Sequence, residues 1–272
     1  RKLTSSGTTG QQTSQIYLDA DTSKLQVRAL SSIVQTFVGK KRLPMVIVDQ
    51  KEILSDRESY GARMAGVLGF SNFGHNHLYA LDESMIPKWN ELADFLYQFR
   101  GQPILLFGFT FIVWQYFFQA AKSTGKRLDF GADSILIHGG GWKKLIAQKV
   151  NNETFKESLR DQLGIGHVSN YYGMVEQVGS VFMECDQGYL HAPGFAEVLM
   201  RDPVTLESSQ SGIVQVMSLL PISYPGHSLL TEDLGSIVGT DNCPCGRKGK
   251  YFLIHGRIPQ AEPRGCSDVR MV

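Results

Sequence analysis

The sequence lacks the short motifs of several large protein classes. Neither a G-x-x-x-x-G-K-[ST] phosphate loop nor a G-x-G-x-x-G dinucleotide fingerprint occurs in its 272 residues. A G-x-S-x-G elbow and an H-E-x-x-H helix are also missing, which disfavours a serine hydrolase and a zinc protease. Internal repeats and low-complexity tracts are absent as well.

Net charge is also low. Lys and Arg number 27 against 26 Asp and Glu, so the formal charge of +1 provides no field that attracts nucleic acid or an anionic membrane. With 42% hydrophobic and 19% charged residues, the composition fits a globular protein of one or two domains. The apolar run from Pro103 to Ala121 is interrupted by Gly108, Gln115 and Gln119, which favours a buried strand, a turn and a core helix over a membrane span.

The sequence shows no signal peptide, because the charged, apolar and small-residue regions of one are missing. The cytoplasm is therefore the expected compartment. The first residue is Arg1 rather than Met, and we expect an N-terminal portion to precede it.

Hydrophobic patterning predicts an α/β layered domain followed by a β-rich region. Helical periodicity occurs from Leu25 to Phe37 and from Trp89 to Phe99. Short apolar runs between such segments predict buried strands at 45–48, 104–107 and 135–137. After about Ser180 the pattern changes to strand-like pieces, including 196–200 and 213–217, separated by Gly, Pro and Asp turns.

A cluster of hydroxyl residues and glycines lies near the start of the chain, and its members are Ser5, Ser6, Gly7, Thr8, Thr9 and Gly10. Glycines let the backbone approach a polyphosphate closely, while amide and hydroxyl donors surround its oxygens. The same composition is also typical of a flexible linker.

Two later segments favour nucleotide binding. A predicted strand runs into Gly139-Gly140-Gly141, where a flat ligand can lie against exposed backbone. Farther on, Tyr172-Gly173 and Glu176 offer an aromatic ring to stack on a base and a carboxylate to hold Mg²⁺.

The order of these three segments resembles the adenylate-forming superfamily, which includes the acyl-CoA synthetases. The resemblance implies that the first loop binds the β- and γ-phosphates of ATP and that the glycine turn forms the adenine wall. It also implies that Asp233 takes the ribose hydroxyls and that Gly256-Arg257 corresponds to the hinge region. Val175 departs from this pattern, since the superfamily commonly has Thr there.

Motifs distributed along nearly the whole chain resemble the LuxE-type acyl-protein synthetases. They are Ser5–Gly10, Gly108-Phe109-Thr110-Phe111, His138–Lys143, Ser223-Tyr224-Pro225-Gly226-His227-Ser228 and Arg264-Gly265-Cys266-Ser267-Asp268. This resemblance implies ATP-dependent activation of a fatty acid and delivery of the acyl group to a fatty-acyl reductase partner, as in bacterial bioluminescence. Relatives also occur outside that pathway.

The resemblance also implies a domain arrangement. Residues 1–180 are expected to form the α/β nucleotide-binding portion of an adenylation domain, and residues 181–255 a β-rich subdomain that completes it. Residues 256–272 are then the hinge and a short tail that carries an acceptor cysteine.

Cys266 is the candidate nucleophile, since a cysteine near the C-terminus accepts the acyl group in the resembled family. A thiolate is strongly nucleophilic near neutral pH, and neighbouring Arg264 would favour the charged form. The alternative is an inert surface thiol near a frayed terminus.

The other three cysteines suggest a metal site. Cys243 and Cys245 form a Cys-Pro-Cys turn, and Cys185 precedes His191 by a short interval. Together they supply four ligands of the kind that zinc prefers, in a pattern that resembles a zinc site in some phenylacetate-CoA ligase relatives. Buried free thiols are the alternative.

Two other functions are compatible with this sequence. An acyl- or aryl-CoA ligase uses the same adenylation chemistry, although the chain ends shortly after Arg257, where such ligases continue into a mobile C-terminal domain. The other is a non-catalytic relative that binds nucleotide or a reductase, a possibility raised by Val175.

Overall fold

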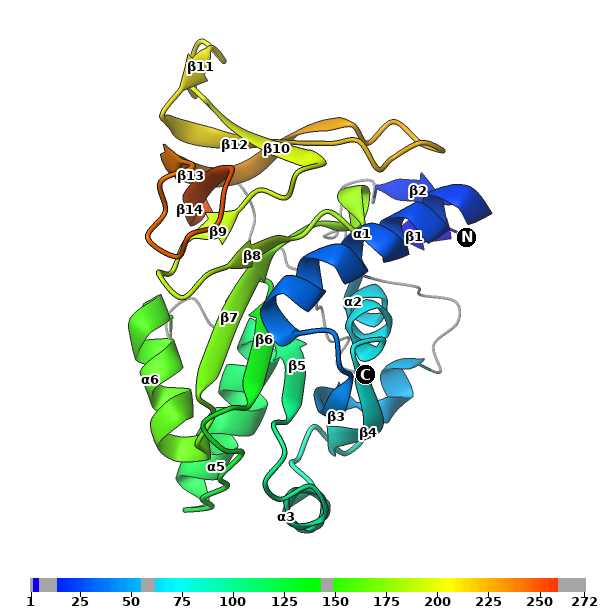
Figure 1. The fold of residues 1–272 in the computed structure, drawn as a ribbon, viewed down its shortest axis with the longest axis vertical. Coiled ribbons are helices and arrows are strands. Elements are labelled where there is room, and N and C mark those ends of the chain that lie inside the picture. The colour runs from blue at the N-terminus through cyan, green and yellow to red at the C-terminus, as the bar shows by residue number, and fades with distance from the viewer. Residues whose placement is uncertain (1, 5–13, 55–61, 143–148, 259–272) are drawn as a thin grey trace. The chain divides into compact units, whose positions relative to one another are not determined.

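The structure is a computed structural model, and it describes residues 2–4, 14–54, 62–142 and 149–258 of the chain. The α/β class expected from the sequence is confirmed (Figure 1). The chain divides into two compact units. Among the described residues, one unit comprises those up to Ile33 together with 171–258, and the other comprises those from Val34 to Asn170. The domain boundaries proposed at residues 180 and 255 stay predictions.

The unit that contains Val34–Asn170 is built on a parallel sheet with the strand order β4-β3-β5-β6. All three short apolar runs predicted as strands lie in it. Its strands are β3 (Leu43–Gln50), β4 (Gly74–Leu81), β5 (Leu105–Phe109) and β6 (Ile135–Gly139). Its longer helices are α2 (Ala62–Ser71), α3 (Trp89–Gln98) and α6 (Asn152–Leu163). Strands that are buried on both faces read as continuous apolar runs, which is why they were predictable.

Local capping fixes the ends of α6. At its start the side chain of Asn151 accepts a hydrogen bond of 2.7 Å from the Thr154 N–H, which satisfies one otherwise unpaired backbone donor. At its end Gly164 has φ +66, a left-handed conformation that a residue with a Cβ adopts at a cost. A Cβ at Gly164 would also collide with Asp129. The helix buries Phe155, Leu159 and Leu163.

The aromatic run after β5 is helical from its first residue. α4 (Thr110–Ile112) starts directly after β5 and continues as the π-helix η2 (Val113–Phe118) and then as α5 (Gln119–Ser123). The expected buried strand and core helix are present, whereas the expected turn between them is absent. None of the helices in the described part of the chain combines the length and apolarity needed to cross a bilayer.

The other unit is mainly antiparallel, as expected for a β-rich second half. Its strands follow the order β11-β10-β12-β13-β14-β9-β8, and β8 pairs with Tyr171 and Tyr172 of β7. These strands are β7 (His167–Tyr172), β8 (Phe182–Glu184), β9 (Leu190–His191), β10 (Ala196–Arg201), β11 (Ser208–Ser209), β12 (Ser211–Ser218), β13 (Ser228–Thr240) and β14 (Lys250–Arg257). Near the start of the chain, β1 (Lys2–Thr4) pairs with β2 (Gln15–Tyr17), and α1 (Ala20–Val38) follows.

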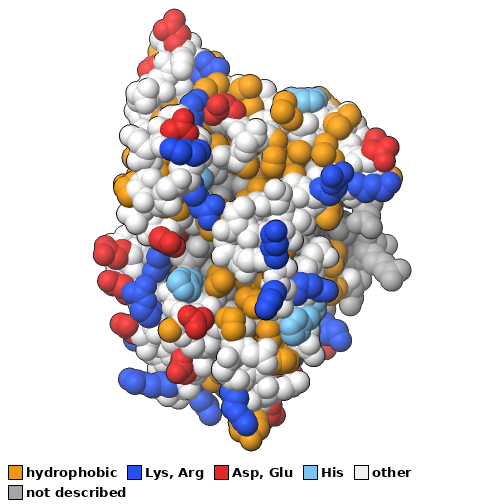
Figure 2. Space-filling view, viewed as in Figure 1, with side chains coloured by type: hydrophobic (Ala, Val, Ile, Leu, Met, Phe, Trp, Pro, Cys, Tyr) orange, Lys and Arg blue, Asp and Glu red, His pale blue; other side chains and the backbone are white. Residues whose placement is uncertain are grey.

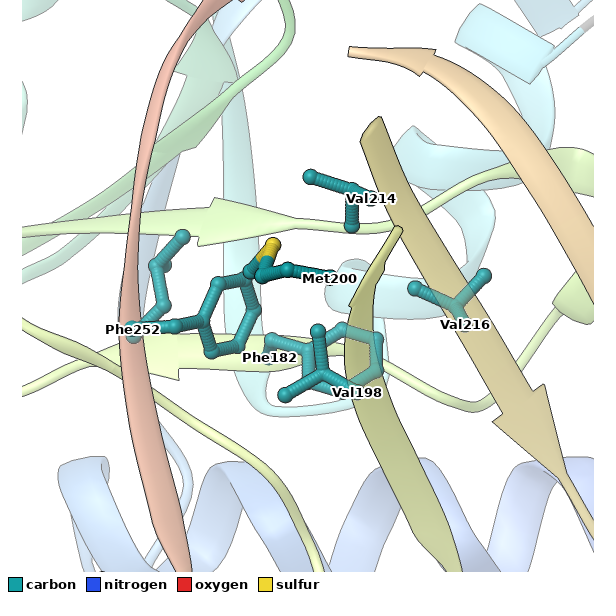
Figure 3. Close-up of a cluster of buried hydrophobic side chains, with 7 residues drawn as sticks. Phe182, Val198, Met200, Val214, Val216 and Phe252 are labelled. Carbon is teal, nitrogen blue, oxygen red and sulfur yellow. The ribbon is translucent and has the colours of Figure 1, made fainter. Parts of the chain in front are cut away.

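A compact apolar cluster holds the antiparallel strands together (Figure 3). Its buried members are Phe182, Leu190, Val198, Met200, Val214, Val216 and Phe252. They come from β8, β9, β10, β12 and β14, so the cluster fixes strands that are distant in sequence. Full burial of each large side chain contributes about 1.5–3 kcal/mol to stability.

The β13–β14 hairpin contains two irregularities of register. Asp233 pairs with Arg257 near one end, and Thr240 pairs with Lys250 at the other. Between them the pairing shifts by one residue after Leu234 and shifts back after Ile237. Such bulges insert an unpaired residue and bend the strand that carries it.

On the face of the molecule seen in Figure 2, acidic and basic side chains are interspersed. This mixture agrees with the formal net charge of +1.

Candidate functional site

Three residues predicted to bind nucleotide meet on the antiparallel unit. The pairing of β13 with β14 places Asp233 directly opposite Arg257, and their side chains approach to 3.6 Å between Oδ1 and Nε. Tyr172, at the end of β7, donates its hydroxyl to Asp233 Oδ2 at 2.8 Å. Arg257 also contacts Glu232 through Nη1 and Oε2 at 3.4 Å. The structure thus brings together Tyr172, Asp233 and Arg257.

Burial shapes the electrostatics of this cluster. Burial raises the pKa of Asp233, and the Tyr172 hydroxyl and the Arg257 charge partly oppose that shift. Burial also raises the pKa of Tyr172 well above its usual value, with the Asp233 charge adding to the effect. Tyr172 is therefore a protonated donor at neutral pH. The Asp233 side chain keeps 19% of its surface exposed, so a ligand can still reach the carboxylate.

The segment that carries Glu176 is fixed by its neighbours. Glu176 lies in the short 3₁₀ helix η4 (Val175–Gln177) and is half-buried. The buried side chain of Gln177 donates from Nε2 to the Gly226 carbonyl at 2.8 Å. A Cβ at Gly226 would lie only 2.7 Å from the Glu176 carbonyl oxygen, so glycine is required for this approach. Val175 lies at the position where the resembled superfamily commonly has Thr, and its side chain is buried, with 4% exposed.

Tyr224 joins this arrangement from the 223–228 motif. Its hydroxyl accepts a hydrogen bond of 3.1 Å from Nε2 of Gln26, a residue of α1. Burial raises the pKa of Tyr224 to about 12, and the charge of Glu176 contributes to the shift.

The sequence analysis did not predict a role for Gln26 or Gln177. The position of Gln177 directly after Glu176 was the available signal, whereas Gln26 offered none.

The glycine turn lies in the parallel-sheet unit. Gly139 is the last residue of β6, and its carbonyl accepts a hydrogen bond of 3.1 Å from Thr110 Oγ1. Gly140 has φ +79, and both Gly140 and Gly141 are exposed. No heavy atom in the described structure lies within 4 Å of a Cβ built on Gly141. The turn therefore offers bare backbone, as a flat ligand requires.

His138 precedes this turn and is buried. Its Nδ1 lies 2.9 Å from Thr110 Oγ1, whereas its Nε2 has no hydrogen-bond partner among the described residues. Burial, followed by the charge of Lys156, lowers the pKa of His138 to about 3. The imidazole is therefore neutral throughout the physiological range.

Other predicted site residues lie outside the described residues. They are Ser5, Ser6, Gly7, Thr8, Thr9 and Gly10 of the phosphate loop, together with Arg264 and Cys266. Their roles stay predictions.

The cysteine and histidine residues predicted to bind zinc converge on the antiparallel unit. One potential ligand atom each from Cys185, His191, Cys243 and Cys245 lies within 4.8 Å of all the others. The sulfur atoms of Cys185 and Cys243 are 3.9 Å apart, and Cys245 Sγ lies 3.4 Å from His191 Nε2. Burial raises the pKa of Cys185 to about 11 and lowers that of His191, where the Arg247 charge also contributes.

Comparison with known sequences gives a match over the whole described region. A family model described as "Acyl-protein synthetase, LuxE" matches residues 1–271. A curated relative, the long-chain-fatty-acid–luciferin-component ligase of Vibrio harveyi, is 25% identical over 152 residues. The match covers 54% of this chain and 39% of that protein, so the chain spans well under two thirds of the relative's length.

Solved structures share the fold. ATP-bound MatB of Rhodopseudomonas palustris matches with a TM-score of 0.56 and 18% identity over 94% of this chain and 47% of that one. A long-chain-fatty-acid-CoA ligase of Archaeoglobus fulgidus matches with a TM-score of 0.60 and 13% identity over 95% and 51% of the two chains. These likenesses confirm the predicted adenylate-forming fold, and at such identities they show the fold alone.

Proposed function

The chain belongs to the LuxE family of acyl-protein synthetases, and on that premise we propose that it activates a fatty acid with ATP and then carries the acyl group on Cys266. The observation that carries the proposal is the contact of Tyr172, Asp233 and Arg257. A carboxylate held in this way accepts hydrogen bonds from the two adjacent hydroxyls of a ribose.

In this proposal each partner of Asp233 has a separate role. The Tyr172 hydroxyl occupies one side of Oδ2 and fixes the orientation of the carboxylate. Arg257 favours the ionised form of Asp233, against the burial that raises its pKa. The remaining lone pairs of the carboxylate are then available for the nucleotide.

The first chemical step is attack of the fatty carboxylate on the α-phosphorus of ATP. A bond forms between the carboxylate oxygen and phosphorus, the bond to the bridging oxygen breaks, and pyrophosphate leaves. Catalysis of such a transfer depends on positioning and on neutralisation of charge. We assign donors for the phosphates to Ser5–Gly10 and the adenine wall to Gly139–Gly141.

Glu176 is the proposed holder of Mg²⁺. The half-buried carboxylate fits this ion, since Mg²⁺ in nucleotide sites uses one or two carboxylates together with substrate phosphates and water. When bound, the ion neutralises charge on the phosphate oxygens. The main-chain position of Glu176 is fixed by the close approach of Gly226.

The second step transfers the acyl group. The Cys266 thiolate attacks the carbonyl carbon of the acyl-AMP, AMP leaves, and a thioester forms. Arg264 favours the thiolate by its positive charge. A fatty-acyl reductase partner would then collect the acyl group from the thioester.

Intact-mass analysis of the full-length protein tests this proposal. After incubation with Mg-ATP and a mixture of fatty acids, the parent protein should gain one acyl mass that hydroxylamine removes. A Cys266→Ser variant should still release pyrophosphate but should lack the hydroxylamine-labile adduct. An equal labile adduct on the parent and the variant would overturn the role of Cys266.

The same experiment, repeated with added CoA, discriminates the two other functions. Acyl-CoA formation with no adduct on either protein would indicate an acyl- or aryl-CoA ligase. Absence of fatty-acid-dependent pyrophosphate release, with nucleotide still bound, would indicate a non-catalytic relative.

A further inference from the structure

The closed end of the β13–β14 hairpin contains a group of side chains that the proposed acyl transfer does not use. Cys243 and Cys245 lie in the loop between Thr240 and Lys250, whereas Cys185 directly follows β8 and His191 ends β9. Tyr251 of β14 pairs with His191 of β9, which brings the two hairpins together. We propose that Cys185, His191, Cys243 and Cys245 bind one Zn²⁺ ion that joins these hairpins.

The distances within this Cys₃His cluster, as we call these four residues, fit a tetrahedron. With Zn–S bonds near 2.3 Å and a Zn–N bond near 2.0 Å, two sulfurs are separated by about 3.8 Å and a sulfur and a nitrogen by about 3.5 Å. The observed separations are 3.9 Å between Cys185 Sγ and Cys243 Sγ and 3.4 Å between Cys245 Sγ and His191 Nε2. All four ligand atoms lie within 4.8 Å of one another.

The cluster is also placed as a structural site requires. Cys185, His191 and Cys243 are 4%, 7% and 5% exposed and Cys245 is partly exposed, so three of the four ligands are shielded from water. None of the three described cysteines forms a disulfide. A closed tetrahedral shell with no open position is typical of structural zinc rather than catalytic zinc.

The backbone of the Cys-Pro-Cys loop forms a tight turn. Gly246 has φ +82, and its N–H donates to the Cys243 carbonyl at 2.9 Å. The Arg247 N–H donates to Cys245 Sγ at 3.5 Å. A sulfur that accepts N–H donors is stabilised as a thiolate, which is the form that binds metal.

The donor set selects the kind of ion. Three thiolates and one imidazole are soft or borderline ligands, whereas Mg²⁺ and Ca²⁺ require oxygen. Binding of Zn²⁺ displaces the thiol protons and leaves a net charge of −1 on the site. Arg247 lies two residues after Cys245, and its N–H contacts Cys245 Sγ, so a compensating cation is adjacent to the site in the chain.

Metal analysis of the tag-free, full-length protein tests the inference. Mass spectrometry of the purified parent should find one zinc per chain, and Cys243→Ser and Cys245→Ser variants should lose it. His167→Asn is the matched control, because His167 is an exposed histidine of β7 outside the cluster. Cys266→Ser should likewise keep its zinc, which separates this result from the fate of the acyl transfer.

A measurement on the parent protein covers the case in which the cysteine variants fail to fold. Replacement of zinc by Co²⁺ should produce the intense visible bands of tetrahedral cobalt and a near-ultraviolet thiolate-to-cobalt charge transfer. Titration with a mercurial should release zinc in proportion to the thiols modified.

Three results would overturn the inference. One is a zinc content below about 0.2 per chain after growth with added zinc, since a closed thiolate site retains its ion through purification. Another is a disulfide between any two of the three cysteines in the native protein. The third is bound zinc that persists in both folded serine variants.

Discussion

The two ends of the β13–β14 hairpin differ in how far their polar side chains are exposed to solvent. At one end Asp233 faces Arg257 and keeps 19% of its side chain exposed, and Tyr172 supplies a hydrogen bond. At the other end Cys185 and Cys243 are 4% and 5% exposed and lie against other sulfur and nitrogen atoms. The first arrangement leaves acceptors open to a ligand, and the second encloses its donor atoms.

This difference separates binding from stability. A partly exposed carboxylate with satisfied protein contacts can change its ligand without disturbing the strands. An enclosed set of soft ligands contributes to folding when it is filled, because the metal-binding free energy then adds to the folding free energy. We therefore expect substitutions at the first end to alter nucleotide affinity and substitutions at the second to alter stability.

The largest effect is expected from Phe252, which lies in the apolar cluster between the two ends (Figure 3). Phe252→Ala should lower the free energy of unfolding by about 3–5 kcal/mol, because the side chain is 0% exposed and its loss leaves a cavity. Urea denaturation measures this change. Leu230→Ala is the control, because Leu230 is 50% exposed and should change stability by less than about 0.5 kcal/mol. Equal losses of unfolding free energy in the two variants would contradict the assignment of this stability to the buried cluster.

A second prediction extends the comparison to the parallel-sheet unit, where His138 is buried beside Thr110. The pKa of His138 is about 3 in the folded protein against an ordinary 6.5. Between these two values the imidazole is protonated in the unfolded chain and neutral in the folded one. Stability is therefore lost as the pH falls from 6.5 towards 3. Relative to a His138→Gln variant, the parent should lose about 2 kcal/mol between roughly pH 6.5 and pH 4.5. Denaturation curves at both pH values measure the difference, and parallel pH profiles would contradict it.

At the open end, Asp233→Asn should weaken ATP binding by roughly 30-fold. Compared with the carboxylate, the amide has one acceptor oxygen fewer and lacks the charge that strengthens both ribose hydrogen bonds. Isothermal titration measures the affinity. Glu232→Gln is a close control, because Glu232 also pairs with Arg257 but is 42% exposed. It should change affinity by less than about 3-fold, as expected for an exposed ion pair. Equal losses in the two variants would point to general charge rather than to Asp233.

The smallest effect is expected from Tyr172→Phe, which removes the hydrogen bond to Asp233 and keeps the aromatic ring. ATP affinity should fall by about 5-fold, in line with one hydrogen bond worth about 1 kcal/mol. The same titration measures it. A Tyr172→Phe loss as large as that of Asp233→Asn would mean that Tyr172 contacts the nucleotide directly rather than orienting the carboxylate.

Much of the fold was predictable from local patterns. Strands β3, β5 and β6 are continuous apolar runs, and α1 and α3 repeat apolar residues with helical period. The π-helix η2 was not predicted, because its aromatic run looks the same in any buried helix. The displaced pairing in the middle of the β13–β14 hairpin, from Gly235 to Ile237, depends on bulges that leave no local signal in the sequence.

The predictable part of the candidate site consists of residues with distinctive chemistry. Cys243-Pro244-Cys245 and the pair Cys185 and His191 suggested a common ligand set from composition and spacing alone, and the structure brings them together. Gln26 and Tyr224 contact each other across 198 positions. A single sequence gives no signal for such a contact, because neither Gln26 nor Tyr224 belongs to a local pattern that predicts its partner.

The paired irregularities of the β13–β14 hairpin have a consequence for how this chain can change during evolution. The first shift leaves one extra residue on β14 and the second leaves one on β13, so the pairings Asp233–Arg257 and Thr240–Lys250 keep the same offset. Deletion of an extra residue, His255 on β14 or Val238 on β13, would remove one bulge and leave the other pairs aligned. Deletion of a paired residue would instead slip the strand beyond it and turn side chains to the wrong face. Deletions in these strands should therefore be tolerated at these two positions and selected against at the paired positions between them.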